Sequence, residues 1–274
     1  MIQLYNLTAT GLHCDGILRK TGIVVCALVM SIGTISCRKA SSETVERGAA
    51  RPVKEAIAES DALYAQRADL VKVRQAIVAL RQAQADDSTN YDLAWRLAKY
   101  NYYLGAHSPV SEEQWKSFRD GIEAGKLAVQ IQDNKPEGHF WLGANYGGNA
   151  KISTLAGLSA VEDIKSEMET VLRIDAKYQA GSAYLGLGQL YLESPKILGG
   201  DVSKAIGYLE KGIKIGPDND LMRAKLAAAY AEAHRNEDAR KQIETIISTK
   251  PSPDFRPEYD EALAEAKKIQ EKIK

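Results

Sequence analysis

The feature that most constrains the fold of this 274-residue chain is a repeat with a period of 34 residues in its C-terminal half. Three pairs of positions recur at that spacing: Ala205 with Ala239, Leu209 with Ile243, and Pro217 with Pro251. Periods of this length are typical of arrays of small supersecondary units, in which each unit buries its apolar face only against its neighbours. The repeat therefore predicts a stacked array.

The composition of the body predicts that each unit is helical. From Pro52 onward the residues Ala, Leu, Lys, Glu, Gln and Arg dominate, and alternating runs of β-branched residues are scarce. The dominant residue types lose little rotamer freedom in a helix. We therefore predict an all-α fold.

The recurring positions are those of a tetratricopeptide hairpin, in which a small residue of helix A lets helix B approach closely. In the last repeat the large, small and aromatic positions of helix A are Leu226, Ala227 and Tyr230. The preceding unit has the same pattern at Leu187, Gly188 and Tyr191. The pattern predicts a tetratricopeptide-like α-α superhelix of stacked helical hairpins over residues 52–274.

Looser matches extend the array toward the N-terminus, at Leu97-Ala98 and at Leu142-Gly143. Together they predict about four and a half hairpins. An amphipathic helix from Pro257 to Ile273, rich in Glu and Lys, has the character of a C-terminal capping helix. The small, apolar run from Asn149 to Val161 is compatible with an irregular helix beside a cleft or with a packed loop.

The N-terminal segment has the layout of a secretory signal. The basic pair Arg19-Lys20 precedes an uncharged, mostly apolar run from Thr21 to Ser36, which is shorter than the roughly 20 residues of a membrane-spanning helix. We predict a signal peptide over residues 1–36 and a flexible tether over residues 37–51.

The residues Thr34-Ile35-Ser36-Cys37 resemble the lipobox of bacterial lipoproteins, in which the cysteine is lipidated and becomes the first residue after cleavage. Thr34 departs from the usual Leu of that box. Cys14 and Cys26 would be removed with the signal, which would leave Cys37 as the only cysteine of the mature chain. The alternative is that Cys37 is an incidental small residue at the end of an apolar helix. If Cys37 is lipidated, we expect the protein to attach to the membrane through this lipid anchor only.

No pattern in the sequence indicates an enzyme. The usual spacings of metal ligands, activated nucleophiles and phosphate-binding loops are missing, so we predict neither a catalytic residue nor a metal or cofactor. Lys and Arg together number 36, as do Asp and Glu. This balance gives no overall field that would attract nucleic acid.

Ligands or partners of such arrays are held on the inner wall, which the A helices line. Aromatic residues of these helices outside the repeat positions, chiefly Tyr102, Phe140 and Tyr184, are candidates for a concave apolar site. The alternative is that they belong to the core.

Two polar residues of the segment around Trp141 are further candidates. His139 either binds a ligand or is a hydrogen-bonded residue of a packed helix. Asn145 lies among Gly143, Gly147 and Gly148, which break a helical pattern. These glycines indicate either the close approach of a ligand or tight helix packing, because Gly costs about 1 kcal/mol against Ala inside a helix.

Three features together resemble the TatT family: the lipobox-like Cys37, the segment Leu142 to Gly147, and the segment Ser194 to Ala205. The resemblance spans roughly residues 54–250, and its most specific part is the turn Pro195 to Asp201 followed by Lys204. In that family, a tetratricopeptide lipoprotein is associated with a tripartite ATP-independent periplasmic (TRAP) transporter and partners its solute-binding protein.

The resemblance implies a lipoprotein of the bacterial cell envelope that faces the periplasm and docks a solute-binding protein. It also implies a hydrophobic small-molecule ligand and a homo-oligomer. It assigns no ligand residues one by one. The alternative function is an envelope assembly or secretion scaffold that binds peptide segments of partner proteins.

Overall fold

The computed structural model describes residues 52–248, 250, 251 and 256–273, without the side chains of residues 154–159, 256 and 257. Helices account for all the regular structure of these residues, which confirms the all-α prediction. Their bounds are α1 Val53–Tyr64, α2 Leu70–Asp86, α3 Tyr91–His107, α4 Ser111–Ile131, α5 Pro136–Ile152, α6 Thr154–Asp175, α7 Ser182–Glu193, α8 Val202–Ile215, α9 Asp220–Glu232, α10 Asn236–Ser248 and α11 Arg256–Lys272, with 3-10 turns at Tyr178–Gly181 and Lys196–Leu198.

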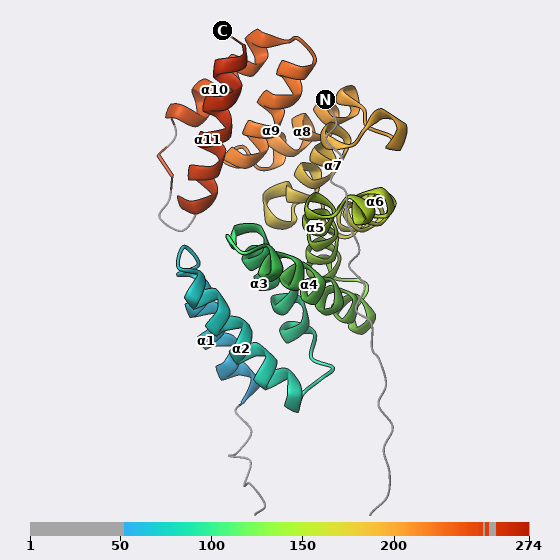
Figure 1. Cartoon of the computed structure of the whole chain (residues 1–274), viewed down its shortest axis with the longest axis vertical. Coiled ribbons are helices and arrows are strands. Elements are labelled where there is room, and N and C mark those ends of the chain that lie inside the picture. Colours follow the sequence, from blue (N-terminus) through green and yellow to red (C-terminus); the bar gives the residue numbers. More distant parts are fainter. Residues whose placement is uncertain (1–51, 249, 252–255, 274) are drawn as a thin grey trace, which may run out of the picture. The chain divides into compact units, whose positions relative to one another are not determined.

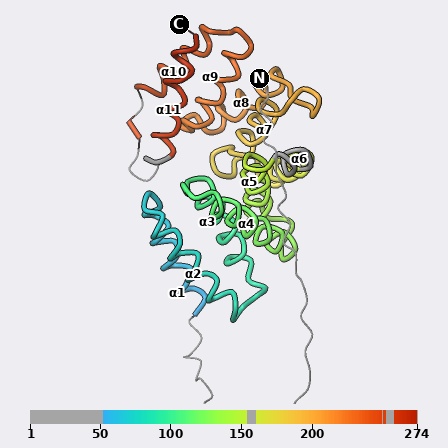
Figure 2. The backbone as a smooth tube through the Cα atoms, viewed as in Figure 1, coloured from blue at the N-terminus to red at the C-terminus, as the bar shows by residue number. Residues whose placement is uncertain are grey.

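The helices pair in chain order into hairpins, from α1–α2 through α9–α10, and α11 packs on α9 and α10. Figure 1 shows the pairs following one another from the blue to the orange segments, and Figure 2 traces the same order along the backbone. Each odd-numbered helix also contacts the next odd-numbered helix. We call this continuous layer, made of α1, α3, α5, α7, α9 and α11, the A-helix wall.

Two details of the array differ from the sequence predictions. Five hairpins, rather than about four and a half, precede α11 in the described part of the chain. The segment from Asn149 to Val161 is neither an irregular helix nor a loop, because α5 continues to Ile152 and α6 begins at Thr154. Only Ser153 between them has an extended backbone.

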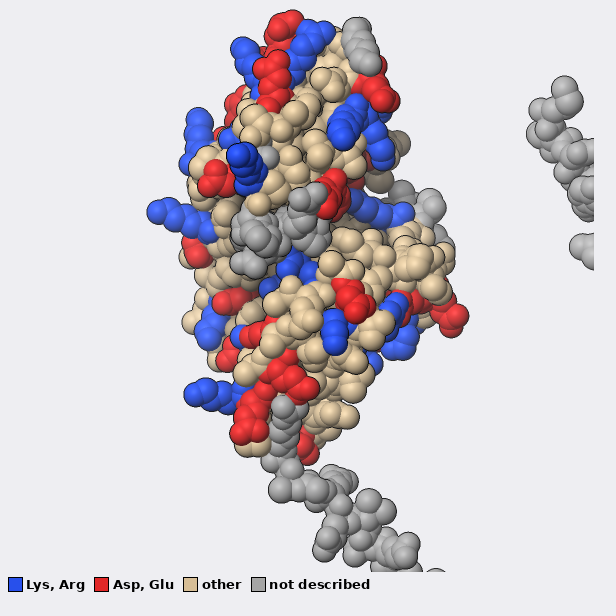
Figure 3. All heavy atoms as spheres, turned by 90° about the vertical axis from the view of Figure 1, so that its left-hand side faces the viewer, with Lys and Arg blue, Asp and Glu red and all other residues tan. Residues whose placement is uncertain are grey.

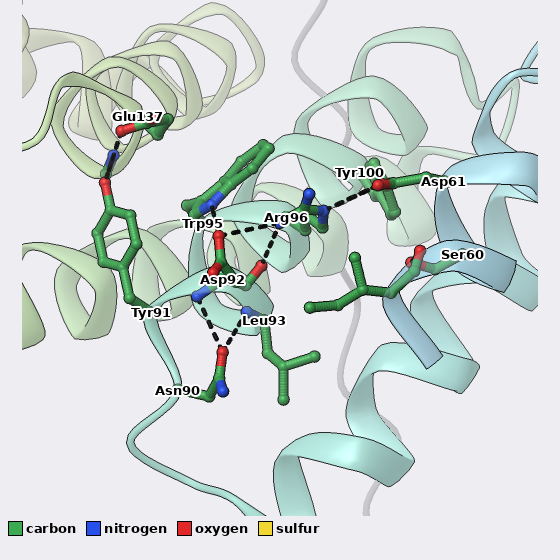
Figure 4. A network of polar contacts seen from close by, with 12 residues as sticks. Ser60, Asp61, Asn90, Tyr91, Asp92, Leu93, Trp95, Arg96, Tyr100 and Glu137 are labelled. Atoms are coloured by element: carbon green, nitrogen blue, oxygen red, sulfur yellow. Dashed lines mark hydrogen bonds and ion pairs between the residues drawn. The ribbon is translucent and has the colours of Figure 1, made fainter. Parts of the chain in front are cut away.

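Polar side chains fix where several helices begin. The side chain of Asn90 accepts hydrogen bonds from the backbone N–H groups of Asp92 and Leu93 at the start of α3 (Figure 4). Asp201 caps α8 in the same way. Such caps satisfy N–H groups that have no partner within the helix and typically contribute about 1 kcal/mol each.

Three residues organise the long turn between α7 and α8. Pro195 follows the end of α7, Gly199 has a positive φ of 92°, and Asp201 caps the next helix. Gly200 is not among the glycines with a positive φ. A Cβ there would lie 1.9 Å from the carbonyl oxygen of Ser194, so Gly200 is required by the close approach of the backbone.

The repeat positions lie where the hairpins interlock. Leu226 and Ala227 of α9 are buried, and a Cβ at Gly188 of α7 would lie 2.4 Å from Cγ of Leu209 in α8. Leu209 itself is 0% exposed. The small residue of helix A therefore determines how closely helix B approaches, as the sequence pattern predicts.

Of the three α5 glycines that the sequence analysis singled out, two serve helix packing. A Cβ at Gly148 would lie 2.1 Å from the ring of Phe118 in α4, and one at Gly143 would lie 3.0 Å from Met168 in α6. At Gly147 the nearest atom would be 4.0 Å away, which is ordinary contact. Tight packing thus explains Gly143 and Gly148 but not Gly147.

The first hairpin also contacts the last helix. Arg67, in the turn between α1 and α2, donates hydrogen bonds of 2.8 to 3.0 Å to both carboxylate oxygens of Glu258 in α11. Bidentate pairs of this kind restrict geometry more than single ion pairs do.

No helix among the described residues is both long and apolar enough to cross a membrane.

The close contact at Gly188 predicts a stability difference within one hairpin. We expect Gly188→Ala to lower the free energy of unfolding by about 1–3 kcal/mol, because its Cβ would overlap the buried Leu209. Gly207→Ala in α8 is the matched control, since a Cβ there meets nothing within 4 Å. We expect it to raise stability by about 0.4–1 kcal/mol. Urea unfolding followed by circular dichroism measures both, and equal effects would contradict the packing role of Gly188.

Candidate functional site

Charged and aromatic side chains join α1 to α3 at the N-terminal end of the A-helix wall. Arg96 Nε lies 3.0 Å from Oδ1 of Asp61, and the hydroxyl of Tyr100 donates to the same carboxylate (Figure 4). The ring of Tyr64 stacks on that of Tyr100 with centroids 4.2 Å apart. These contacts hold the Tyr64 ring beside α3.

A second set of contacts joins α3 to α5. The hydroxyl of Tyr91 donates to Glu137 at 3.0 Å and accepts from the backbone N–H of Gly138 at 3.2 Å (Figure 4). The side-chain amide of Asn145 donates to the backbone oxygens of Ala98 at 2.9 Å and Trp141 at 2.7 Å. The helix that carries Trp141 is therefore held against α3.

Lys99 of α3 contacts one aromatic ring from α1 and one from α5. Its Nζ is 4.7 Å from the ring centroid of Tyr64 and 5.8 Å from that of Trp141. Burial lowers the pKa of Lys99 below its ordinary value, and the negative charge of Asp61 offsets part of that effect. We call Tyr64, Lys99, Tyr102 and Trp141 together the Lys99 site.

Tyr102 completes this site. Its ring lies 5.7 Å from that of Trp141 and 6.2 Å from that of Phe118, and the residue is partly buried. Burial raises the pKa of Tyr102 to about 12, and the negative charges of Glu261 and Glu193 add to the effect. Tyr102 is therefore neutral at physiological pH and lies within reach of charges on α7 and α11.

Two of the other candidates from the sequence, Phe140 and Asn145, contact Trp141 and are buried. Phe140 packs edge-on against Trp141 at 4.9 Å and against Tyr178 at 5.4 Å. Asn145 is 0% exposed, and its amide nitrogen is used in the two contacts to backbone oxygens. The ring of Phe140 and the side-chain amide of Asn145 therefore hold Trp141 in place.

Tyr184 does not join this group. Its ring lies 6.4 Å from that of Tyr208 in α8, and its Cβ would lie 2.8 Å from a Cβ placed at Gly212. Tyr184 therefore faces the partner helix of its own hairpin.

His139 has polar partners on both ring nitrogens. Nδ1 lies 2.6 Å from a carboxylate oxygen of Glu167 in α6, and Nε2 lies 2.7 Å from the backbone oxygen of Asp133. Both neighbours are acceptors, so the arrangement favours the doubly protonated imidazolium. Burial lowers the pKa of His139, but its hydrogen bonds to Glu167 and Asp133 outweigh that effect and hold the pKa above its ordinary value.

The wall also contains a lysine, Lys225, whose pKa is raised, whereas that of Lys99 is lowered. Lys225 of α9 lies 2.9 Å from Glu265 of α11 and 3.4 Å from Glu193 of α7. Burial alone would lower the pKa of Lys225, but these two carboxylates raise it above its ordinary value. Lys225 is thus a compensated charge that ties three helices of the wall together.

Sequence reasoning missed Lys99, Tyr64 and Trp141 as site residues. A usable signal was present, because Lys99 and Tyr102 are three residues apart and so lie on one face of α3. Tyr64 and Trp141 gave no such signal, since they are far apart in the chain.

The predicted lipidation site, Cys37, lies outside the described residues, as do the predicted signal peptide and tether. Among the residues described, no three His, Cys, Asp or Glu side chains gather to hold a metal ion.

The contacts of His139 predict a pH dependence of stability. Because its folded-state pKa is raised, His139 contributes stability that is fully present below the ordinary pKa of about 6.5 and is lost as the pH rises through the folded-state value. We expect the stability difference between wild type and His139→Gln, measured by urea unfolding, to shrink between pH 6 and pH 9. Glu167→Gln should weaken the same pH dependence. A difference that is constant across this range would contradict the charged pair.

Comparison with solved structures identifies the type of fold. A thermophilic TPR protein of Thermus thermophilus superposes with a TM-score of 0.58 at 20% sequence identity, and the match covers 78% of this chain and 100% of that chain. Two structures of MamA align with TM-scores of 0.47 and 0.45 at 18% identity, covering 77% and 76% of this chain and 93% and 94% of theirs. The first match confirms the tetratricopeptide-like superhelix. No curated protein sequence matches the chain.

Two family models match the sequence. Residues 56–188 are similar to the family described as regulator of microtubule dynamics protein 1-3. Residues 123–268, from α4 to α11, match the family described as TRAP transporter T-component, which confirms the resemblance drawn from the sequence motifs. This second match covers more than half of the chain, and the chain therefore belongs to the TAtT family of TRAP transporter T-components.

Proposed function

We propose that this protein is a lipid-anchored scaffold that docks the solute-binding protein of a TRAP-type transporter on its A-helix wall. The observation that carries the proposal is the T-component match over residues 123–268. The family and the fold are non-catalytic kinds of protein, and the family indicates association with the cell envelope. In this proposal the protein faces the periplasm.

The A-helix wall is the surface that suits a protein partner. It is continuous from α1 to α11, so that a partner could contact several repeats at once. Over the face seen in Figure 3, basic and acidic side chains are intermixed over most of the surface. A partner that recognises such a surface depends on matched individual charges and aromatic contacts rather than on net charge.

The proposal includes a hydrophobic ligand beside Tyr102. This residue is partly exposed, and its ring packs beside the buried rings of Trp141 and Phe118. In this arrangement His139, Phe140 and Asn145 position α5 rather than contact the ligand. Tyr184 would stabilise the α7–α8 hairpin.

Membrane attachment is tested at Cys37. We expect Cys37→Ala to move the protein from the membrane fraction to the soluble periplasmic fraction, because no acyl chain could be attached. Cell fractionation and immunoblotting measure the distribution, and Cys26→Ala is the matched control that should remain in the membrane. Retention of Cys37→Ala in membranes would contradict the lipid anchor.

Docking is tested by site-specific photo-crosslinking. Glu261 on α11 is exposed, and its charge acts on Tyr102 of α3, so a photoreactive amino acid at this position samples the wall. We expect it to crosslink in cells to a solute-binding protein of a TRAP transporter, identified by mass spectrometry. The same substitution at Ile247, an exposed residue of α10, should not capture that protein.

Two outcomes would contradict docking on the wall. One is equal capture from positions 261 and 247. The other is capture from position 261 of envelope assembly or secretion proteins without a solute-binding protein, which would favour the alternative scaffold function.

A further inference from the structure

The turn between α7 and α8 presents an isolated apolar side chain to solvent. Ile197 is 92% exposed, more than any other large hydrophobic residue of the described chain. Hydrogen bonds order the backbone around it, because the N–H groups of Leu198 and Gly200 both donate to the carbonyl oxygen of Pro195, at 2.8 and 3.1 Å. A side chain held out by an ordered backbone costs less entropy when it contacts a partner.

Two stacked tyrosines lie beside this turn, one from each helix of the hairpin. The rings of Tyr191 in α7 and Tyr208 in α8 have centroids 5.5 Å apart and are nearly parallel, at 7°. Both residues are partly exposed. The backbone N–H of Asp201 donates to the carbonyl oxygen of Tyr191 at 2.9 Å, which ties the end of the turn to the part of α7 that carries the stack.

Three exposed lysines border the turn and the stack. Lys204 Nζ lies 5.3 Å from the ring centroid of Tyr191, and Lys211 Nζ lies 5.9 Å from that of Tyr208. Their spacing places Lys204, Tyr208 and Lys211 on one face of α8, and Lys196 is exposed in the turn. Among the described residues, no carboxylate lies within ion-pair distance of the ammonium groups of these lysines. We define the turn patch as Tyr191, Lys196, Ile197, Lys204, Tyr208 and Lys211.

The α6 side of the turn patch carries charges of both signs. Lys165 of α6 pairs with Glu162 at 3.3 Å. Burial raises the pKa of Tyr208 above its ordinary value, and Tyr191 and Glu169 add to the effect. The charge of Lys165 opposes it. The exposed carboxylates of Glu162 and Glu169 would repel an anionic bilayer, whereas a protein partner can place its own carboxylates opposite the lysines alone.

We infer that the turn patch binds an acidic amphipathic segment of a partner protein. Carboxylates of the segment would pair with the three lysines, and its apolar side chains would pack on Ile197 and on the exposed parts of the two tyrosine rings. Burial of Ile197 contributes affinity, and the ion pairs determine which segments bind. The inference does not rest on the proposed function, because it uses no residue of the Lys99 site.

The test measures the fluorescence anisotropy of a labelled, terminally blocked peptide of Leu-Glu-Glu-Leu-Leu-Glu-Glu repeats as the full chain is added. A second peptide has every Glu replaced by Gln. We expect saturable binding of the acidic peptide and binding at least about threefold weaker for the Gln peptide, since each exposed ion pair contributes little by itself.

Substitutions in the turn patch separate its charged and apolar parts. Lys204→Gln combined with Lys211→Gln should weaken binding of the acidic peptide about three- to tenfold and leave binding of the Gln peptide unchanged. Ile197→Ser should weaken binding of both peptides at least about threefold, because it removes apolar surface that either peptide would bury. All three side chains are exposed, so these variants keep the packing of the hairpin.

The chain offers a matched control for each substitution. Lys135 is also exposed and lies 4.8 Å from the ring centroid of Tyr91, and Ile247 of α10 is 48% exposed. Lys135→Gln and Ile247→Ser should each change the affinity for the acidic peptide by less than about twofold, because these residues lie on other hairpins. Three results would overturn the inference: no saturable binding of the acidic peptide to wild type, equal binding of the two peptides, or equal effects of the turn-patch and control substitutions.

Vesicles of phosphatidylcholine, with and without phosphatidylglycerol, separate a protein partner from a membrane. If phosphatidylglycerol raises the fraction of wild type that sediments with the vesicles, the double lysine variant loses this increase, and the acidic peptide does not bind, then the turn patch contacts anionic lipid and its assignment to a protein segment is wrong. Saturable binding of the acidic peptide without an effect of phosphatidylglycerol would support the assignment.

Discussion

The close approach of α4 to α5 is the contact on which the middle of the array depends. A Cβ at Gly125 would lie 2.9 Å from Cα of Leu142, and one at Gly121 would lie 2.0 Å from the side-chain oxygen of Asn145. At both positions only the hydrogen atom of a glycine fits between the two helices. Because α5 is held this closely, the amide of Asn145 reaches the backbone of Ala98 in α3 and links three consecutive helices.

That linkage places the aromatic residues of the wall. Trp141 precedes Asn145 by one helical turn and accepts a hydrogen bond from it through its backbone oxygen. Its ring therefore faces Tyr102 and the ammonium of Lys99 across the α3–α5 contact. A charged group beside these rings is less hydrated than a surface lysine is, so nearby charges act on it more strongly.

Cationic side chains of the wall occur in three kinds of surroundings. Toward the C-terminal helices, Lys225 is neutralised by carboxylates of α7 and α11. The first hairpin is joined to α11 through the bidentate contact between Arg67 and Glu258. Lys99 lies over the rings of Tyr64 and Trp141, and the charges of Asp61 and Glu258 offset part of the effect of its burial. The first two arrangements are direct ion pairs, whereas the third is a contact between a cation and aromatic rings.

The sequence by itself determined the all-α class, the tetratricopeptide register at Gly188 and the turn that ends at Asp201, because these depend on local propensity and on spacing within one hairpin. It also drew attention to Tyr102. Only the tertiary structure decided that Tyr184 turns toward α8, that Asn145 is internal, and that Lys99 lies over the rings of Tyr64 and Trp141. These properties depend on which residues of separate helices meet, and a repeat pattern specifies the helix spacing without specifying the side chains that face one another across it.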